Sequence, residues 1–456
     1  MSEAQPGYDW RPQPQAGAWL EMLGQRLHER LPEARALAAR LHDEAAVRLL
    51  DLVDTIRLAP DSAAARDAHA AGWTQRRPGD RPIVLDNPHG LFPAVALDDR
   101  LAGEDLAVEL KVEAVGDFLV AHELSRAIEG QPGSPLRRAV VWQGGGASLA
   151  VVERHGWRGL EPGPAATDEL VARVLEAFRH RRRDLGSDET GFAEVERLVD
   201  DAIAALGRDR ACHLFFVAER EYWQSRNSAA QAQKARQDAL GIGWANHDHH
   251  TYRSSRGNFV RLVALWEKLG FACRERFYAG REAGWGAQVM EQPAAGIVTF
   301  NDVDLTPKEL LNDFAHEPLP ARDELGTVGL WCALHGDSLL EAGMHHLECQ
   351  FDFAALGRQL ADEAGVGMMK PFTDLPHLRQ AFTEGERWAV RRERVASLRA
   401  AGRISAEQAE QFERHGAIGS HLENLERHDG FKGFNQKGVS EIIAETDPRR
   451  HQLGAR

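Results

Sequence analysis

The sequence predicts an α+β protein with paired βαβββ modules in its C-terminal half and a helix-rich α+β N-terminal half. Three patterns support this prediction. Leucine and valine recur at helical spacing over residues 15–58. Short apolar runs punctuated by glycine and proline over residues 80–165 are typical of strands and turns. From residue 241 onward, strand-like and helix-like segments alternate.

The chain has 456 residues and is long enough for more than one folded unit. We expect four parts, which are an N-terminal helical segment at 1–75, an α+β region of unassigned role at 76–240, the βαβββ pair at 241–447 and a tail at 448–456. Within the pair we expect a helical insertion near 378–414. Gly402 ends one of its helices, and Ser405 with Gln408 predicts a capping box at the start of the next.

The N-terminal half ends in a series of helical patterns. Residues 167–207 and the polar stretch 219–240 both predict helix. Between them, the run Cys212–Glu219 (CHLFFVAE) is largely apolar and predicts a buried strand. Earlier, Gly144–Gly146 predicts a hairpin turn and not a phosphate-binding loop, because no Lys-Ser or Lys-Thr pair follows it.

The C-terminal half contains two similar units. The first has a strand in WANHDHHTYR, a helix in GNFVRLVALWEKLG that ends at Gly270, and three strands in FACRERFYAG, WGAQVMEQ and GIVTFNDV. The second has a strand in GMHHLECQFDF and a helix in AALGRQLADEAGV. It closes with the strand SHLENLER and the helix GVSEIIAET. The shared order predicts two copies of one βαβββ unit.

Composition limits the partners of the chain. Lysine and arginine total 55 against 69 acidic residues, and the formal charge of -14 disfavours nucleic acid. No run approaches the roughly 20 apolar residues of a membrane span, and the N-terminus lacks the features of a signal peptide. The four cysteines do not suggest a disulfide framework. We therefore expect a cytoplasmic protein with a small-molecule substrate and no nucleic-acid or membrane partner, and a homo-oligomer is compatible with the sequence.

Histidines are clustered at the start of each C-terminal unit. His247, His249 and His250 lie on the opening strand of the first unit, and His345 and His346 on that of the second. Two histidines with one carboxylate suit oxygen-activating Fe(II), whereas other mixtures of imidazole and carboxylate suit zinc or copper. Adjacent strand residues point to opposite faces, so only one histidine of a neighbouring pair can face a given site. The equivalent positions predict a metal centre shared by the two units.

The second unit resembles the 4-hydroxyphenylpyruvate dioxygenases of the vicinal oxygen chelate superfamily. GMHHLECQFDF and the helix after it resemble their second-histidine segment, in which the ligand follows a glycine by three residues, and this selects His346. LENLERHDGFKGFNQKGVSEIIAETD resembles their closing signature. That resemblance aligns the ligand glutamate with Glu423 and the arginine four residues later with Arg427. Phe434, in the glycine–phenylalanine turn that follows, is expected to wall the pocket.

The first unit carries a matching segment. Asp248-His249 and the strand that follows resemble the opening Asp-His of the same dioxygenases, which selects His249. Arg253, four residues further on, resembles an arginine of the 2-oxoadipate dioxygenase/decarboxylase family, and LRQ at 378–380 resembles another segment of that family. Positions i and i+4 of a strand share a face. The resemblance therefore implies that Arg253 clamps a substrate carboxylate and that Gln380 contacts the substrate.

These resemblances imply a mononuclear non-haem Fe(II) dioxygenase that oxidatively decarboxylates a 2-oxo acid with O2. His249, His346 and Glu423 would hold the iron, with no catalytic side chain beyond the metal site. Two kinds of rival function remain, a metal-dependent isomerase, lyase or extradiol-type enzyme of the same fold and a ligand-binding relative without turnover. Three residues remain open as alternative ligands: His250, Glu291 and Glu348.

Overall fold

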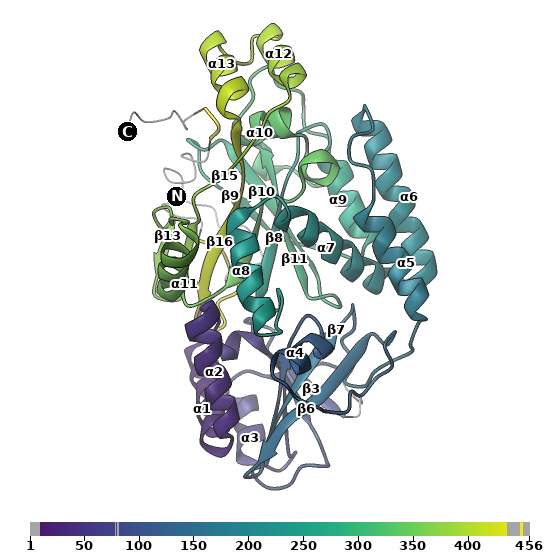
Figure 1. The fold of residues 1–456 in the computed structure, drawn as a ribbon, viewed down its shortest axis with the longest axis vertical. Helices are drawn as coiled ribbons and strands as arrows, with labels where there is room; N and C mark the ends of the chain where they lie inside the picture. Colours follow the sequence, from purple (N-terminus) through teal and green to yellow (C-terminus); the bar gives the residue numbers. More distant parts are fainter. Residues whose placement is uncertain (1–9, 78, 80–81, 436–446, 450–456) are drawn as a thin grey trace.

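The computed structural model describes residues 10–77, 79, 82–435 and 447–449. These residues form two mixed β-sheets that follow one another along the long axis of the molecule, with helices around both (Figure 1). The first sheet has seven strands and the second has nine. This architecture confirms the α+β class that the sequence predicts.

The N-terminal half is built on the seven-stranded sheet, in the order β2-β3-β4-β1-β5-β7-β6. Its strands are β1 (Val53–Leu58), β2 (Thr74–Gln75), β3 (Ile83–Asp86), β4 (Ala94–Leu97), β5 (Leu106–Lys111), β6 (Leu136–Gly144) and β7 (Ala147–Arg154). Its helices are α1 (Pro14–Arg30), α2 (Pro32–Ala45), α3 (Ala63–Ala70) and α4 (Val115–Ala121). The predicted hairpin turn at Gly144–Gly146 joins β6 to β7. Because β1 lies in the middle of the sheet, the helix predicted over residues 15–58 is wrong at its end, and the expected helical segment 1–75 also contains strands.

Four helices lead from the first sheet to the second. They are α5 (Asp168–Arg179), α6 (Asp188–Leu206), α7 (Arg208–Gln224) and α8 (Ser228–Ala239). The run Cys212–Glu219 lies inside α7, so the prediction of a buried strand there is wrong. A short apolar run does not by itself distinguish a buried strand from a buried helix. Helix α7 is buried on more than one side, since Phe215 contacts Phe178 of α5 and Phe216 contacts Trp266 of α9 (Phe259–Lys268).

The C-terminal half is built on the nine-stranded sheet, in the order β13-β14-β16-β12-β8-β11-β10-β9, with β15 paired to β16. The first module consists of β8 (His247–Arg253), α9 (Phe259–Lys268), β9 (Ala272–Tyr278), β10 (Trp285–Gln292) and β11 (Ile297–Asp304). The second consists of β12 (His346–Gln350), α11 (Phe353–Gln359), β13 (Thr373–Leu375), β14 (Leu378–Phe382) and β16 (Ala417–Arg427).

The two modules are related by their strand order. Counted outward from the centre of the sheet, β8-β11-β10-β9 and β12-β16-β14-β13 have the same arrangement. In each module the first strand is parallel to the last, and β8 pairs antiparallel with β12 where the modules meet. The strand order therefore confirms the predicted βαβββ pair.

The insertion in the second module begins later than the sequence suggested. Leu378–Phe382 and Glu386–Trp388 are strands β14 and β15, so the predicted helical span of 378–414 is wrong at its start. The remaining helices are α10 (Thr327–His335), α12 (Arg392–Ala400) and α13 (Ala406–His415). Ser405 and Gln408 form the predicted capping box. The predicted C-terminal helix GVSEIIAET lies outside the described residues.

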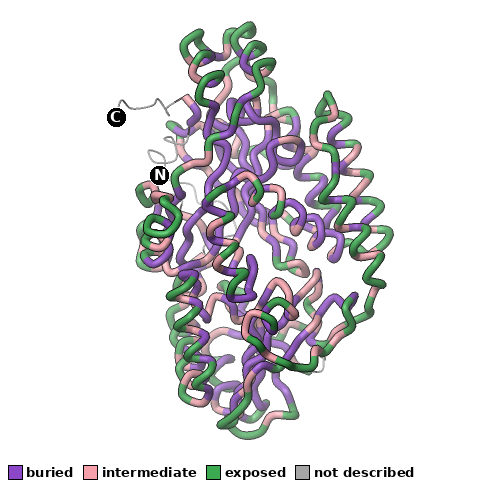
Figure 2. The backbone as a smooth tube through the Cα atoms, in the orientation of Figure 1, coloured by how far each residue is buried: buried purple, intermediate pink, exposed green. Residues whose placement is uncertain are grey.

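One continuous cluster of buried apolar side chains joins the two halves of the chain. It runs from Leu41 in α2 through Val108 in β5 and Phe216 in α7 to Leu347 in β12. Figure 2 shows the buried residues concentrated in the two sheets and the exposed ones on the outer sides of the helices. In the described part of the chain, no helix combines the length and the apolar character that crossing a bilayer requires.

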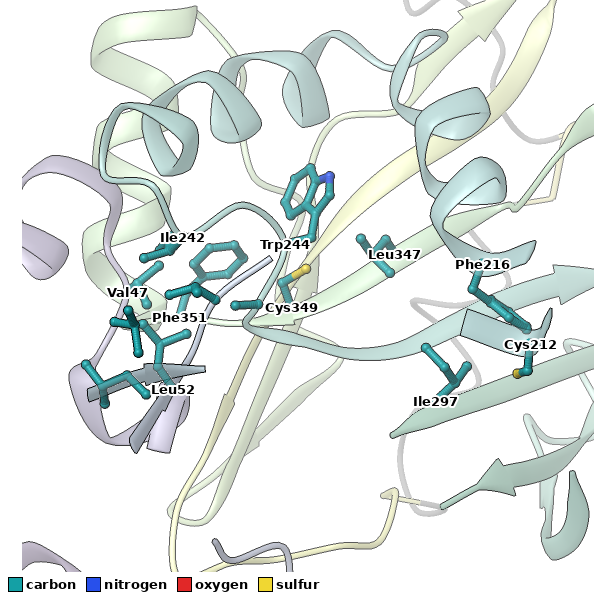
Figure 3. Close-up of a cluster of buried hydrophobic side chains, with 14 of the residues drawn as sticks. Val47, Leu52, Cys212, Phe216, Ile242, Trp244, Ile297, Leu347, Cys349 and Phe351 are labelled. Carbon is teal, nitrogen blue, oxygen red and sulfur yellow. The ribbon is translucent and has the colours of Figure 1, made fainter. Parts of the chain in front are cut away.

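The packing of β12 determines which of its side chains point away from this core. Leu347 and Cys349 belong to the core cluster, which also contains Trp244 (Figure 3). Alternate residues of a strand point to opposite faces. His346 and Glu348 are therefore directed to the other face of the sheet, which we call the inner face.

Candidate metal centre

The inner face of the second sheet carries buried polar side chains around a cavity of about 50 Å³. They come from five strands, with His249, Thr251 and Arg253 on β8, Asp302 on β11, His346 and Glu348 on β12, Gln380 on β14 and Glu423 on β16. Aromatic side chains complete the wall of the cavity. Residues far apart in the sequence meet here because the first and last strands of both modules are neighbours in the sheet.

Two imidazoles and two carboxylates converge at the centre of this cavity. Nε2 of His249 lies 2.7 Å from Oε1 of Glu348, and Nε2 of His346 lies 2.9 Å from the same oxygen. Nε2 of His346 is also 3.6 Å from Oε2 of Glu423. Side-chain atoms of His249, Glu348 and Glu423 lie within 4.8 Å of one another. The structure therefore brings together the three predicted ligands and one of the alternatives, Glu348.

Burial determines the ionisation of these four groups. It lowers the pKa of His249 to about 4 and that of His346 well below its ordinary value, so both rings are neutral near pH 7. Burial also raises the pKa of Glu423 to about 7, against the hydrogen bonds it accepts. Burial and the neighbouring Glu423 raise the pKa of Glu348 well above its ordinary value. Neutral imidazoles beside carboxylates that have no cation of their own are a donor set that fits a divalent transition metal.

Asp248 orients the first histidine. Its Oδ1 lies 2.8 Å from Nδ1 of His249, and a proton on Nδ1 leaves the lone pair of Nε2 directed into the cavity. Arg427 donates two hydrogen bonds to the same carboxylate, at 3.0 and 3.1 Å. Burial raises the pKa of Asp248, but Arg427 and His249 oppose it and hold that pKa well below its usual range. Asp248 is therefore a charged partner that positions His249.

Replacing Asp248 with asparagine is expected to weaken metal binding roughly ten- to a hundredfold, the usual effect of removing a carboxylate that orients a ligand histidine. The neutral amide accepts a weaker hydrogen bond from Nδ1 and pairs less well with Arg427. Competition with a coloured chelator measures the affinity. Asp98→Asn is a matched control, because Asp98 is a buried carboxylate paired with arginines in the first sheet. Equal metal affinity in Asp248→Asn and Asp98→Asn would contradict the positioning role.

The three residues predicted to bind substrate also lie at the cavity. Arg253 is 2% exposed and its Nε is 3.6 Å from Oδ2 of Asp302. Its Nε and Nη1 have no hydrogen-bond partner among the described residues. Gln380 donates to Oε1 of Glu423 at 2.8 Å and so orients that carboxylate. The ring of Phe434 stands edge-on to His249, with 4.9 Å between the ring centroids.

The other two alternative ligands do not join the cluster. His250 points to the opposite face of β8, where its Nε2 accepts a hydrogen bond from Arg220 at 3.3 Å. Glu291 forms an ion pair with Lys432 at 2.9 Å and does not line the cavity. The period of two along a strand accounts for the position of His250, since its neighbour His249 faces inward.

The sequence-based prediction missed Asp302, the partner of Arg253, and most of the aromatic wall. The sequence feature that could have identified Asp302 is the alternation in the strand IVTFNDVD. Phe300 and Asp302 lie two residues apart and therefore share one face of that strand. Placing that face against Arg253 requires the parallel pairing of β8 with β11, in which Asp302 is the register partner of Arg253. A single sequence does not provide that pairing.

Comparisons with known proteins give limited similarity. No family model matches the sequence, and no curated protein matches it. Among solved structures, methylmalonyl-CoA epimerase from Mycobacterium tuberculosis is 13% identical over 40% of this chain and 88% of its own, with a TM-score of 0.24. A variant of 4-hydroxymandelate synthase from Streptomyces coelicolor is 17% identical over 75% of this chain and 98% of its own, with a TM-score of 0.30.

An uncharacterized protein from Shigella flexneri is 12% identical over 57% of this chain and 73% of its own, with a TM-score of 0.25. Similarities at this level do not assign a family or an activity. The evidence for the paired modules is therefore the strand order of the chain itself, and the evidence for the candidate metal centre is the geometry of its side chains.

Proposed function

We propose that this chain is a mononuclear non-haem Fe(II)-dependent dioxygenase that oxidatively decarboxylates a 2-oxo acid with O2. The observation that carries the proposal is the convergence of His249, His346 and Glu423 from three strands on one cavity. Two imidazoles and a carboxylate are the donor set of oxygen-activating Fe(II) sites. Bound Fe(II) would supply the Lewis-acid and redox chemistry.

The remaining side chains of the cavity support binding of a 2-oxo acid. Arg253 is buried, its Nε is 3.6 Å from Asp302, and its Nη1 has no hydrogen-bond partner among the described residues. A guanidinium binds a carboxylate through paired, charge-assisted hydrogen bonds. We infer that the substrate has its 2-oxo carboxylate near the histidines and a second, remote carboxylate at Arg253. Phe300 and Phe434 contact His249 and make that part of the cavity wall apolar.

Glu348 is the observation that favours a second candidate function. It lies within hydrogen-bonding distance of both histidines. In octahedral coordination, three protein ligands leave positions for a bidentate substrate and O2 together, whereas four leave positions for the substrate alone. A four-ligand site that includes Glu348 would suit a metal-dependent isomerase or lyase, in which O2 takes no part.

Two matched substitutions separate these candidates. Glu423→Gln is expected to remove oxygen consumption and most iron binding, because an amide is a poorer ligand for iron than a carboxylate. Glu348→Gln, the same change on the neighbouring strand, is expected to keep the iron. Iron content after anaerobic reconstitution and oxygen uptake are the two measurements. Equal loss of iron in both variants would favour the four-ligand site. Retained activity in Glu423→Gln would contradict the role of Glu423 as a metal ligand.

The reaction itself is tested with a panel of 2-oxo acids. The iron-loaded protein is expected to consume O2 and release CO2 in equal amounts with at least one member that carries a second carboxylate. Turnover of a chelating substrate with zinc, nickel or manganese and without oxygen uptake would replace the proposal by the isomerase or lyase function. A chain that binds metal and small acids without turning any of them over would be a ligand-binding relative.

A further inference from the structure

A second cavity, of about 450 Å³, is lined by residues of α5, α7 and α8 and by Glu113 and His155, which follow strands β5 and β7 of the first sheet. It is separate from the candidate metal centre, since the two share no lining residue. The cavity reaches the outer face of β8 through Arg220, whose Nη1 donates to Nε2 of His250 at 3.3 Å. The proposed dioxygenase chemistry assigns no role to this cavity or to the residues that line it.

Arg220 is a buried charge without a counter-charge. It is 4% exposed and lines the cavity. Its Nε has no hydrogen-bond partner, and no carboxylate among the described residues forms an ion pair with its guanidinium. Burial lowers the pKa of Arg220, and the attraction of Glu113 opposes this only in part. A buried charge that lacks a partner is costly, so a ligand that supplies the missing negative charge would bind here favourably.

The other charged groups around the cavity have partners of their own. The two carboxylates that line it each have a basic partner, because Glu113 pairs with Lys234 at 3.2 Å and Glu221 pairs with Arg179 at 2.6 Å. Lys234 and Arg179 also pair with Asp238 and Glu176. His213 also lines the cavity and offers an imidazole at its wall. Among the lining residues that the structure describes, Arg220 is therefore the charged side chain without an ion-pair partner.

Basic groups continue behind Arg220. Nζ of Lys111 lies 3.3 Å from Nε2 of His247, and the ring of His247 is 5.2 Å from that of His250. Burial lowers the pKa of Lys111 to about 8, so this amine is charged at neutral pH. Arg220, with Lys111 behind it, therefore places positive charge on the side of the cavity that faces β8, and this charge favours an anionic ligand.

The rest of the wall is apolar and comes from Val171, Leu175, Leu214, Val217 and Trp244. We propose that this cavity binds a small organic anion, with its phosphate or carboxylate group at Arg220 and an apolar body against these side chains. A guanidinium binds either oxyanion with charge-assisted hydrogen bonds. The volume is that of a small-molecule site, because pockets of about 300–1,000 Å³ bury most of a ligand.

Calorimetric titration of the full chain with three related probes tests the proposal. Phenyl phosphate, benzoate and benzyl alcohol share an aromatic body and differ in the charged group. We expect the anions to bind one saturable site per chain. Benzyl alcohol, which lacks the charge, is expected to bind at least about tenfold more weakly than the anions. The tighter of the two anions identifies the oxyanion that the site prefers. Failure of both anions to bind the protein at millimolar concentration would overturn the proposal.

Substitutions then locate the site. Arg220→Gln is expected to weaken binding of the preferred anion roughly ten- to a hundredfold. Arg197→Gln, which removes an exposed arginine of α6, should leave the affinity unchanged. Val217→Phe keeps Arg220 but fills part of the cavity, so it should abolish binding even if Arg220→Gln does not fold. Binding that is lost in Arg253→Gln and kept in both Arg220→Gln and Val217→Phe would place the anion in the metal-centre cavity and overturn the proposal.

Discussion

Replacing His346 with alanine is expected to abolish most metal binding. Its Nε2 lies within 3.6 Å of both carboxylates of the cluster, so the change removes one of two imidazoles from the centre of the donor set. The loss of affinity should exceed the roughly ten- to hundredfold effect of removing a residue that only orients a ligand. Metal analysis after anaerobic loading with Fe(II) and removal of unbound metal measures the result.

His345→Ala is the matched control. His345 is equally buried and adjacent in the sequence, but its Nδ1 lies 3.0 Å from the carbonyl oxygen of Gly419 and its ring packs against Trp331. We expect this variant to keep one metal ion per chain. Full metal occupancy in His346→Ala would contradict the assignment and shift the metal to the group formed by His249, Glu348 and Glu423.

The strand periodicity made these residues predictable. On β8 and β12 the inward residues alternate with core residues, so His346 and Glu348 face the cavity while Leu347 and Cys349 enter the core. Period two is a local property of the chain, and a single sequence contains it. The same argument holds for the paired modules, because the two units show the same order of strand and helix patterns.

Features that depend on long-range pairing were not predictable in this way. Helix α7 is apolar on more than one side because it packs between other helices and the second sheet, and its apolar run Cys212–Glu219 therefore has the composition of a buried strand. Strand β14 pairs with β16, which is more than 30 residues further along the chain. Asp302 meets Arg253 only through the register of β11 against β8.

Replacing Arg253 with alanine is expected to weaken substrate affinity roughly ten- to a hundredfold and to leave the iron content unchanged. The guanidinium lines the same cavity as the metal ligands, and its Nη1, which has no hydrogen-bond partner among the described residues, can bind a remote carboxylate. Charge-assisted hydrogen bonds contribute about 1.5–3 kcal/mol, which corresponds to that loss. Arg253→Lys should restore only part of the affinity, because an ammonium group lacks the planar fork. Steady-state oxygen uptake with the preferred 2-oxo acid gives the apparent affinity.

The buried partner Asp302 provides the control for a purely structural effect. Burial raises the pKa of Asp302 to about 8, although Arg253 opposes this shift. When the pKa of a carboxyl is higher in the folded than in the unfolded state, the folded protein loses stability as the pH rises between the two pKa values. For Asp302 that range runs from about 4, the pKa in the unfolded state, to about 8. Without Arg253 this loss of stability is larger. The melting temperature of Arg253→Ala should therefore fall further below that of the parent protein at pH 8 than at pH 5.

Combining Arg253→Ala with Asp302→Asn removes that titration and should restore the melting temperature at pH 8. The double variant is nevertheless expected to bind substrate as weakly as Arg253→Ala, because the donors that recognise the carboxylate are still missing. This difference separates recognition from folding. If substrate affinity returns together with stability in the double variant, or if Arg253→Ala loses its iron, then Arg253 supports the architecture of the cavity and does not bind the substrate.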